Sequence, residues 1–395
     1  MKSRALWWLV VLAGCGGTDA PQGWHVVFDD LEAPVLSAWT APSGRTFFVG
    51  GAPEAGLILA SDGHNWERMA VANAPRLWWV FGFSDDDVWA VGEHGAVLFY
   101  DGVLWRYAVS ATSGTLYGVW GTSDQEMWAV GQGGVVMHRG PLAWDLEATG
   151  LPDEGDLYKV WGADGVVYAV GERGNILRRD ASGWTRMTSG TTETLRTVVG
   201  RAANDVWAVG GQQGPVALHF DGQSWTEMGP MFGAPLVGVT LDASVWATSA
   251  TGELFERTGD AWTQIDLGLP ASLHFVAIGS GGRRFAGGGT TDGHGVLVAY
   301  GDASRNAITG APPARAPTGN PSGGTLGAGA ACVSDPNGCM SGYLCYTLQY
   351  AAPICSHACA TASDCDDLGA HACCTLPEGQ ILNNVCVPSG TSGCP

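Results

Sequence analysis

The stretch VWAVG at residues 88–92 decides the fold, because it returns along the chain at a nearly constant interval. Close copies stand at residues 127–131, 167–171 and 206–210, and weaker ones at 46–50, 245–249 and 284–288. Their central aromatic residues are Phe48, Trp89, Trp128, Tyr168, Trp207, Trp246 and Phe285, spaced by 41, 39, 40, 39, 39 and 39 residues. The chain therefore contains seven repeat units with a period near forty residues.

Each unit contains four short apolar runs separated by turn residues. In one unit, an opening run at 77–82 precedes VWAVG, a run VLFY follows at 97–100, and a D-G-x-x-W segment closes the unit at 101–105. Runs rich in β-branched and aromatic residues, bounded by Gly and Asp, indicate strands. Both alternating sets of side chains are apolar, so each sheet is expected to be covered on both faces. This pattern predicts an all-β chain with a seven-bladed β-propeller of four-stranded antiparallel blades over residues 23–302.

The two ends of this region predict how the ring closes. The seventh unit ends at residues 296–302 without a closing Trp, whereas a spare closing segment with Trp24 stands 42 residues before Trp66. We expect this N-terminal strand to complete the last blade, so that no blade edge stays unpaired. The alternative is an unrelated N-terminal extension. The closing residues Trp105, Trp144, Trp184, Trp225 and Trp262 recur once per unit and are interpreted as packing residues.

Composition and charge exclude several classes of protein. Gly accounts for 60 of 395 residues and charged residues for 14%, which disfavours long helices and coiled coils. The 46% hydrophobic content includes 18 Trp, so the chain is expected to fold. With 38 acidic and 19 basic residues, the formal net charge is −19. Such a chain repels phosphate backbones, and nucleic acid is excluded as a partner.

The closing segments carry a resemblance to a known family. The fullest of them, SDGHNW at residues 61–66, resembles the Asp-box repeats of the sialidase-like propeller superfamily. The whole unit is similar to propellers found in secreted myxobacterial lipoproteins. The resemblance covers roughly residues 23–302 and implies the propeller fold. It leaves function open, because propellers include hydrolases, lectins, assembly factors and scaffolds.

The first residues predict export. Lys2 and Arg4 precede an apolar stretch at residues 5–13, and LAGC ends at Cys15. This ending resembles the lipobox of bacterial lipoproteins, which implies a signal peptide at 1–14, lipid on Cys15 and a tether at 15–22. An ordinary cleaved signal is the alternative. The expected location is the outer membrane or cell surface, with the lipid as the membrane contact.

The C-terminal part reads as a linker and a disulfide-rich domain. Residues 303–331 are rich in Pro, Gly and Ala and have no hydrophobic period. Residues 332–395 hold ten cysteines, and this density in an exported chain predicts disulfides rather than a zinc cluster. Their pairing is left open. The run from Cys359 to Cys374, with the adjacent pair Cys373 and Cys374, resembles the cysteine-rich N-terminal module of Dickkopf-type secreted proteins, which implies at most a protein-binding module. The ten are Cys332, Cys339, Cys345, Cys355, Cys359, Cys365, Cys373, Cys374, Cys386 and Cys394.

No catalytic residue, cofactor or metal site is predicted. The chain contains no G-x-S-x-G, H-E-x-x-H or P-loop pattern. The sialidase resemblance would imply an arginine triad, but Arg45, Arg76 and Arg196 match no sialidase motif, so no role is transferred to them.

A binding face is predicted from the turns that follow VWAVG. In an antiparallel blade these turns share one face with the connections between blades, including the acidic one at residues 153–156. Trp78 and Trp79 depart from the repeat and are further ligand candidates. We therefore expect a monomeric, non-catalytic binding or scaffolding protein whose partner is a protein or glycan of the cell envelope or exterior. The alternative is a glycan-acting hydrolase with two acidic groups at the propeller mouth. The turn candidates are Glu93, His94, Gln132, Glu172, Arg173 and Gln212.

Overall fold

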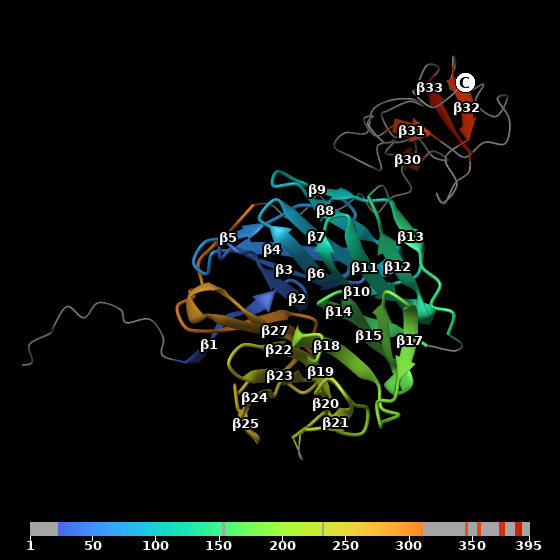
Figure 1. The fold of residues 1–395 in the computed structure, drawn as a ribbon. Helices are drawn as coiled ribbons and strands as arrows, with labels where there is room; N and C mark the ends of the chain where they lie inside the picture. The colour runs from blue at the N-terminus through green and yellow to red at the C-terminus, as the bar shows by residue number, and fades with distance from the viewer. Residues whose placement is uncertain are drawn as a thin grey trace, which may run out of the picture.

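The computed structural model describes residues 23–141, 143–151, 155–230 and 233–310, together with four short strands near the C-terminus. Seven sheets, formed by strands between residues 24 and 309, are arranged as a ring of seven blades, as predicted (Figure 1). In each blade the first strand lies nearest the axis and the fourth at the rim. Cys15, the predicted signal peptide and the side chains of the ten C-terminal cysteines lie outside the described residues. Within them, no helix has the length and apolar character needed to cross a membrane.

The first four blades follow one another along the chain. Blade 1 contains β2 (Val35–Thr40), β3 (Thr46–Ala52), β4 (Ala55–Ser61) and β5 (Trp66–Arg68). Blade 2 contains β6 (Leu77–Ser84), β7 (Asp87–Gly92), β8 (Val97–Tyr100) and β9 (Trp105–Tyr107). Blade 3 contains β10 (Leu116–Ser123), β11 (Glu126–Gly131), β12 (Val136–Arg139) and β13 (Trp144–Leu146). Blade 4 contains β14 (Leu157–Ala163), β15 (Val166–Gly171), β16 (Ile176–Asp180) and β17 (Gly183–Met187).

The remaining blades complete the ring. Blade 5 contains β18 (Leu195–Ala202), β19 (Asp205–Gly210), β20 (Val216–Phe220) and β21 (Trp225–Glu227). Blade 6 contains β22 (Leu236–Leu241), β23 (Val245–Ser249), β24 (Leu254–Thr258) and β25 (Ala261–Ile265). Blade 7 contains β26 (Ala271–Ile278), β27 (Arg284–Thr290), β28 (Gly295–Tyr300) and β1 (Trp24–Leu31). Short 3-10 turns are η1 (Glu93–Gly95), η2 (Gln132–Gly134), η3 (Glu172–Gly174) and η4 (Ser280–Gly282). Two C-terminal hairpins pair β30 (Leu344–Tyr346) with β31 (Ile354–Ser356), and β32 (His371–Thr375) with β33 (Asn384–Pro388).

Ring closure by the N-terminal strand is confirmed. β1 pairs antiparallel with β28, with Trp24 opposite Tyr300 and Val26 opposite Val298. The closing Trp residues explain why this register is favoured, since each packs on an aromatic residue of the preceding blade. Trp144 lies 5.9 Å from Trp89, and Trp262 lies 6.3 Å from Trp207, between ring centroids. Across the closure, Trp24 of blade 7 likewise lies 6.0 Å from Trp246 of blade 6.

The Asp of each D-G-x-x-W segment holds the turn into the outer strand. In the segment beginning at Ser61, Asp62 Oδ1 accepts the backbone N–H groups of His64 and Asn65, both at 2.8 Å. These hydrogen bonds stabilise the ionised carboxylate and lower the pKa of Asp62 to about 2. Asp101 and Asp221 accept the same pair of N–H groups in their own turns. The repeated Asp is therefore explained by turn geometry.

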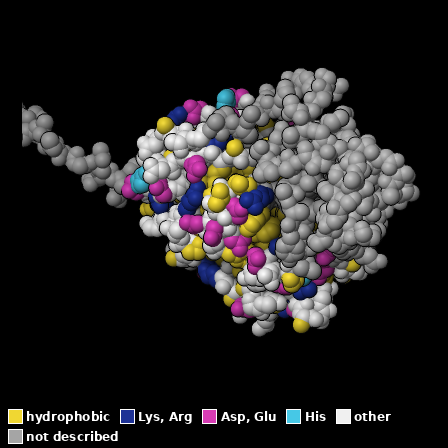
Figure 2. All heavy atoms as spheres, turned by 90° about the horizontal axis from the view of Figure 1, so that it is seen from above, with side chains coloured by type: hydrophobic (Ala, Val, Ile, Leu, Met, Phe, Trp, Pro, Cys, Tyr) yellow, Lys and Arg dark blue, Asp and Glu magenta, His cyan; other side chains and the backbone are white. Residues whose placement is uncertain are grey.

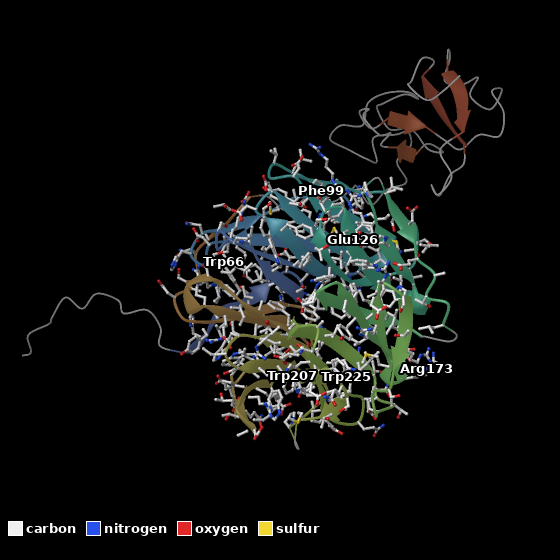
Figure 3. The ribbon with its side chains drawn as sticks, in the orientation of Figure 1. Trp66, Phe99, Glu126, Arg173, Trp207 and Trp225 are labelled. Atoms are coloured by element: carbon white, nitrogen blue, oxygen red, sulfur yellow. The ribbon has the colours of Figure 1, made fainter. Side chains whose placement is uncertain are left out.

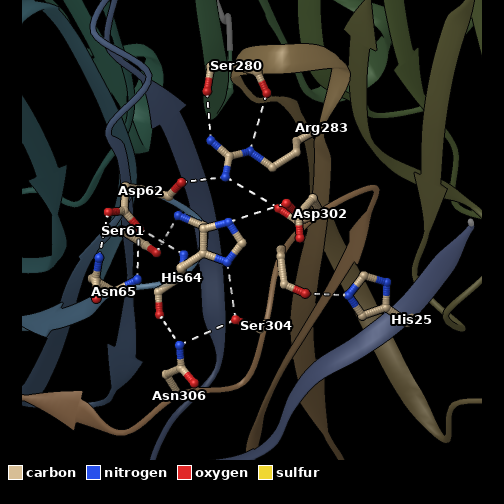
Figure 4. A network of polar contacts seen from close by, with 12 residues as sticks. His25, Ser61, Asp62, His64, Asn65, Ser280, Arg283, Asp302, Ser304 and Asn306 are labelled. Atoms are coloured by element: carbon tan, nitrogen blue, oxygen red, sulfur yellow. Dashed lines mark hydrogen bonds and ion pairs between the residues drawn. The ribbon is translucent and has the colours of Figure 1, made fainter. Parts of the chain in front are cut away.

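The segment after β28 differs from the prediction, because the first eight residues of the expected linker belong to the propeller. Trp66 Nε1 donates to the Ser304 carbonyl at 3.0 Å. His25 Nε2 lies 2.7 Å from the Ala303 carbonyl oxygen (Figure 4). Residues Ile308–Thr309 then form β29, which adds parallel to the rim strand β5. The rim strand of blade 1 has unpaired backbone groups, and β29 satisfies some of them. The C-terminal end of the propeller is thus fixed to blade 1 and to the N-terminal strand of blade 7.

Candidate functional site

Every inner strand carries a β-bulge near its start. In blade 2, Leu77 pairs with Gly92 and Trp79 pairs with Val91, which leaves Trp78, the second residue of β6, without a partner in the register. Five other blades show the same register shift at the second residue of the inner strand, and blade 7 shows it at His274, the fourth residue of β26. The Gly that ends VWAVG makes room for it, since a Cβ on Gly92 would lie 2.3 Å from the Arg76 carbonyl oxygen. A bulge turns the extra side chain out of the normal alternation.

These seven bulge residues surround one cavity at the mouth of the central channel, which we call the channel mouth. The cavity has a volume of about 580 Å³ and is lined by residues of all seven inner strands. It lies on the face formed by the turns after VWAVG, because each inner strand starts beside the end of its second strand. The bulge residues are Leu36, Trp78, Tyr117, Tyr158, Arg196, Val237 and His274.

The channel mouth has an aromatic wall on blades 2, 3 and 4. The ring centroids of Trp78 and Tyr117 are 5.7 Å apart in an edge-to-face contact. Tyr117 and Tyr158 follow at 5.1 Å. Trp79 is next to Trp78 in β6 and lines the same cavity. Such contacts fix the rings against one another.

Cations lie against three of these rings. Lys159 Nζ lies 3.5 Å from the ring centroid of Trp79, and the Arg196 guanidinium carbon lies 5.4 Å from that of Tyr158. Arg76 lies 5.6 Å from the Trp78 ring. Among the described residues, Lys159 and Arg196 form no ion pair with a carboxylate, and the cavity lining includes no Asp or Glu. The channel mouth is therefore positively charged in a strongly acidic chain.

Lys159 reaches Trp79 from two blades away. It belongs to β14, and the equivalent position of the intervening blade is Gly118, where a Cβ would lie 3.0 Å from the Lys159 Cα. Its Nζ donates to the Tyr117 carbonyl at 2.9 Å, and the residue is 7% exposed. Burial lowers the pKa of Lys159 well below its usual value of 10.5.

His274 completes the channel mouth from blade 7. Burial lowers its pKa from 6.5 to about 4, and the nearby charges of Arg196, Arg76 and Lys159 add to the shift. His274 is therefore neutral at pH 7.

His274 predicts a loss of stability in acid. Because the unfolded chain binds its proton near pH 6.5 and the folded chain near pH 4, the unfolded state gains stability as the pH falls through that window. By pH 4.5 the difference amounts to roughly 2 to 3 kcal/mol. Urea unfolding at pH 7 and 4.5 should therefore show a smaller acid loss for His274→Asn than for the wild type. The exposed control His94→Asn should not reduce the loss, because Glu54 raises the pKa of His94.

The acidic side chains of this face stand outside the aromatic wall and have partners. Glu93 Oε1 lies 3.3 Å from Arg76 Nη1, and Asp156 Oδ1 accepts the N–H of Gly133 at 2.8 Å. Glu172 accepts a hydrogen bond of 3.5 Å from the Tyr158 hydroxyl. The outer surface seen in Figure 2, by contrast, carries acidic and basic side chains side by side. Among the residues that the structure describes, a lining with cationic side chains and no carboxylate thus distinguishes the channel mouth.

The structure brings together part of the predicted site. Trp78, Trp79 and Gln212 line the channel mouth. Glu172 contacts the lining residue Tyr158, and Glu93 contacts Arg76, which lies against Trp78. The other candidates lie farther out. His94 Nε2 contacts Glu54 at 2.9 Å, Gln132 accepts from the Thr115 N–H, and Arg173 lies near the rim (Figure 3). Residues 153 and 154 of the acidic connection lie outside the described residues. As predicted, the five closing Trp residues pack between blades.

Several residues of the channel mouth were not predicted. Tyr117, Tyr158, Lys159, Arg196 and His274 follow the opening Leu of their units by one or two positions. One signal in the sequence could have identified them. The residue after the conserved apolar position near the start of each inner strand differs in chemistry between the seven units.

Comparisons with known proteins support the fold. No protein-family model and no curated protein matches the chain. YCF48 from Cyanidioschyzon merolae is 18% identical, with a TM-score of 0.55 over 70% of this chain and 98% of that one. A structure of YCF48 bound to D1 peptide is 16% identical, with a TM-score of 0.57 over 73% and 97%. Virginiamycin B lyase from Staphylococcus aureus is 12% identical, with a TM-score of 0.58 over 70% and 98%. The chain therefore contains a seven-bladed β-propeller.

Proposed function

We propose that this protein is a lipid-anchored binding or scaffolding protein of the cell envelope that recognises its partner at the channel mouth. The observation that carries the proposal is the cavity itself, where seven bulges direct chemically different side chains toward one point on the axis. Four of the VWAVG-type strands, by contrast, keep nearly the same residues in equivalent positions. Chemically different side chains that meet in a concave site are typical of ligand recognition.

A protein partner fits this site best. YCF48, which shares the fold, has been solved with a D1 peptide. The same fold also occurs in a lyase, so the fold alone does not decide between binding and catalysis. A glycan-acting hydrolase would need two carboxylates at the propeller mouth. No Asp or Glu occurs among the described residues that line the cavity, so the geometry favours binding.

The proposal is tested by capture of the partner. The exported chain is immobilised and exposed to cell-envelope extract and to a glycan panel, in parallel with Trp78→Ala and with Asp86→Ala from the opposite face. The partner should be retained by the wild type and by Asp86→Ala and lost by Trp78→Ala. Retention by all three would place the binding site elsewhere, and turnover of a glycan would replace binding with catalysis.

The finer assignments from the sequence remain part of this proposal. The lipobox-like LAGC supports a signal peptide at 1–14 and a surface location. The Asp-box-like turns fit an origin among myxobacterial-type lipoprotein propellers. The disulfide-rich region at 332–395, with its Dickkopf-like spacing, would supply a second protein-binding module.

Lipid on Cys15 gives a large change in fractionation. We expect Cys15→Ala to lose the mass of the lipid and to move from the detergent phase to the aqueous phase in a detergent partition experiment, because acyl chains supply the membrane affinity. Mass spectrometry of the N-terminal peptide identifies the modification. An unchanged partition would contradict the anchor.

A further inference from the structure

The aromatic wall of the channel mouth holds cations in place. One face of Trp78, Trp79 and Tyr158 is each covered by a cation of the same chain, at centroid distances between 3.5 and 5.6 Å. Sugars and bases bind aromatic residues by stacking on a free ring face. Three of the four rings have one face occupied in this way, which leaves fewer free faces for stacking.

These contacts leave the positive charge available. A ring attracts a cation by about 0.5 to 2 kcal/mol through its quadrupole, but it carries no negative charge that would cancel the field. Arg196 contacts the Tyr158 ring and forms no ion pair with a described residue. The indole N–H of Trp78 is buried without a hydrogen-bond partner. The channel mouth therefore presents donors that are oriented and unused, which is what an anion requires.

The charge balance matches a single negative charge. Arg196 contributes a guanidinium, a group that carries its charge in proteins, whereas burial disfavours the charge on Lys159 and on His274. A net charge of −19 on the chain also repels ligands that carry several negative charges. A carboxylate, which the planar guanidinium can bind with two parallel hydrogen bonds, fits better than a phosphate dianion.

The rest of the cavity indicates what is attached to the anion. Opposite the aromatic wall, the lining includes the apolar residues Leu36, Pro235 and Val237 beside His274. A volume of about 580 Å³ holds a carboxylate together with an apolar side chain. We infer that the channel mouth binds the C-terminal carboxylate of a peptide whose last residue is apolar, with Arg196 as its main contact. This inference rests on the proposed function and specifies the partner for the same site.

The test compares one peptide in two chemical forms. An N-acetylated hexapeptide without charged side chains, ending in phenylalanine, is titrated into the full-length protein by calorimetry with either a free or an amidated C-terminus. The amide should bind at least tenfold more weakly. Arg196→Gln should weaken the free-carboxylate peptide by a similar factor and leave the amide unchanged. Arg106→Gln is the matched control, because Arg106 pairs with Asp101 on the outer strand of blade 2 and should have no effect.

Lys159→Met provides a second variant that keeps the fold. Met has nearly the same stem as Lys and removes a buried amine, so the melting temperature should stay the same or rise. Binding of the free-carboxylate peptide should fall several-fold, because a bound anion favours the protonated form of the Lys159 amine, and Met cannot supply that charge.

Several outcomes would overturn the inference. These are equal binding of acid and amide, no binding at millimolar concentration, N-acetylphenylalanine binding as tightly as the hexapeptide, or a uronic-acid oligosaccharide binding more tightly. The proposed function is judged separately. If the captured partner requires Trp78 but is not displaced by excess peptide, carboxylate recognition is refuted and the channel mouth remains the binding site. If the partner neither requires Trp78 nor is displaced by the peptide, both proposals are refuted.

Discussion

Deletion of residues 16–31, which removes β1, is expected to abolish the cooperative unfolding transition of the propeller. The deletion takes Val27, Phe28 and Leu31 out of the core, where they are 1%, 4% and 3% exposed. Burial of each such side chain contributes about 1.5–3 kcal/mol. The sum approaches the whole stability of a typical domain, about 5–15 kcal/mol, and the edge of β28 would lose its hydrogen-bonded partner as well.

Two further variants isolate the cause of that loss. Deletion of residues 16–22 also shortens the N-terminus but retains β1, so it should leave the melting temperature unchanged. Phe28→Ala should destabilise by about 3–5 kcal/mol, because Phe28 packs edge-to-face on Trp66 at 5.0 Å. Circular dichroism against temperature measures all three. A deletion of β1 that melts within two degrees of the wild type would disprove closure by this strand.

Trp78→Ala should weaken binding of the captured partner by tenfold or more. Trp78 lines the cavity, contacts Tyr117 and lies beneath Arg76, so its removal disturbs both the wall and one cation. Trp79→Ala should act similarly, since Lys159 would lose the ring that holds its amine. Aromatic residues at the centre of an interface commonly contribute more than 2 kcal/mol on truncation.

The controls for this prediction are graded by position. Gln132 lies outside the cavity on the same face, so Gln132→Ala should weaken binding only a few-fold. Asp86→Ala lies in a turn on the opposite face and should have no effect. Thermal melting of each variant separates a binding loss from a folding loss. Loss of binding in Asp86→Ala with normal binding in Trp78→Ala would reverse the face assignment.

The fold could be predicted because the repeated apolar residues are the ones that each blade buries. VWAVG returns about every forty residues since each blade buries the same second strand between two neighbours. Trp24 was equally informative. The last repeat unit lacks a closing Trp, and Trp24 supplies one from the N-terminal end of the propeller. The start of the linker was misjudged, since Ile308–Thr309 pair with β5 through backbone groups that leave no hydrophobic period.

The site was harder to predict for a physical reason. A bulge inverts the side-chain alternation at one position, and no single residue type marks it, since Leu36, Trp78 and Arg196 all occupy it. The contacts that define the channel mouth also join different blades. Lys159 meets Trp79 across 80 residues of sequence, through a gap left by Gly118. Trp78 and Trp79 could be selected because they broke the repeat, whereas the cations could not.

Fluorine NMR of protein labelled with 5-fluorotryptophan tests the central claim that ligands bind at the channel mouth. Phe substitutions assign the signals of Trp78 and Trp79, and of the packing residues Trp144 and Trp262. On addition of the captured partner, the Trp78 and Trp79 signals should shift while those of Trp144 and Trp262 stay in place. Shifts confined to Trp144 and Trp262, with Trp78 and Trp79 unchanged at saturation, would contradict the account.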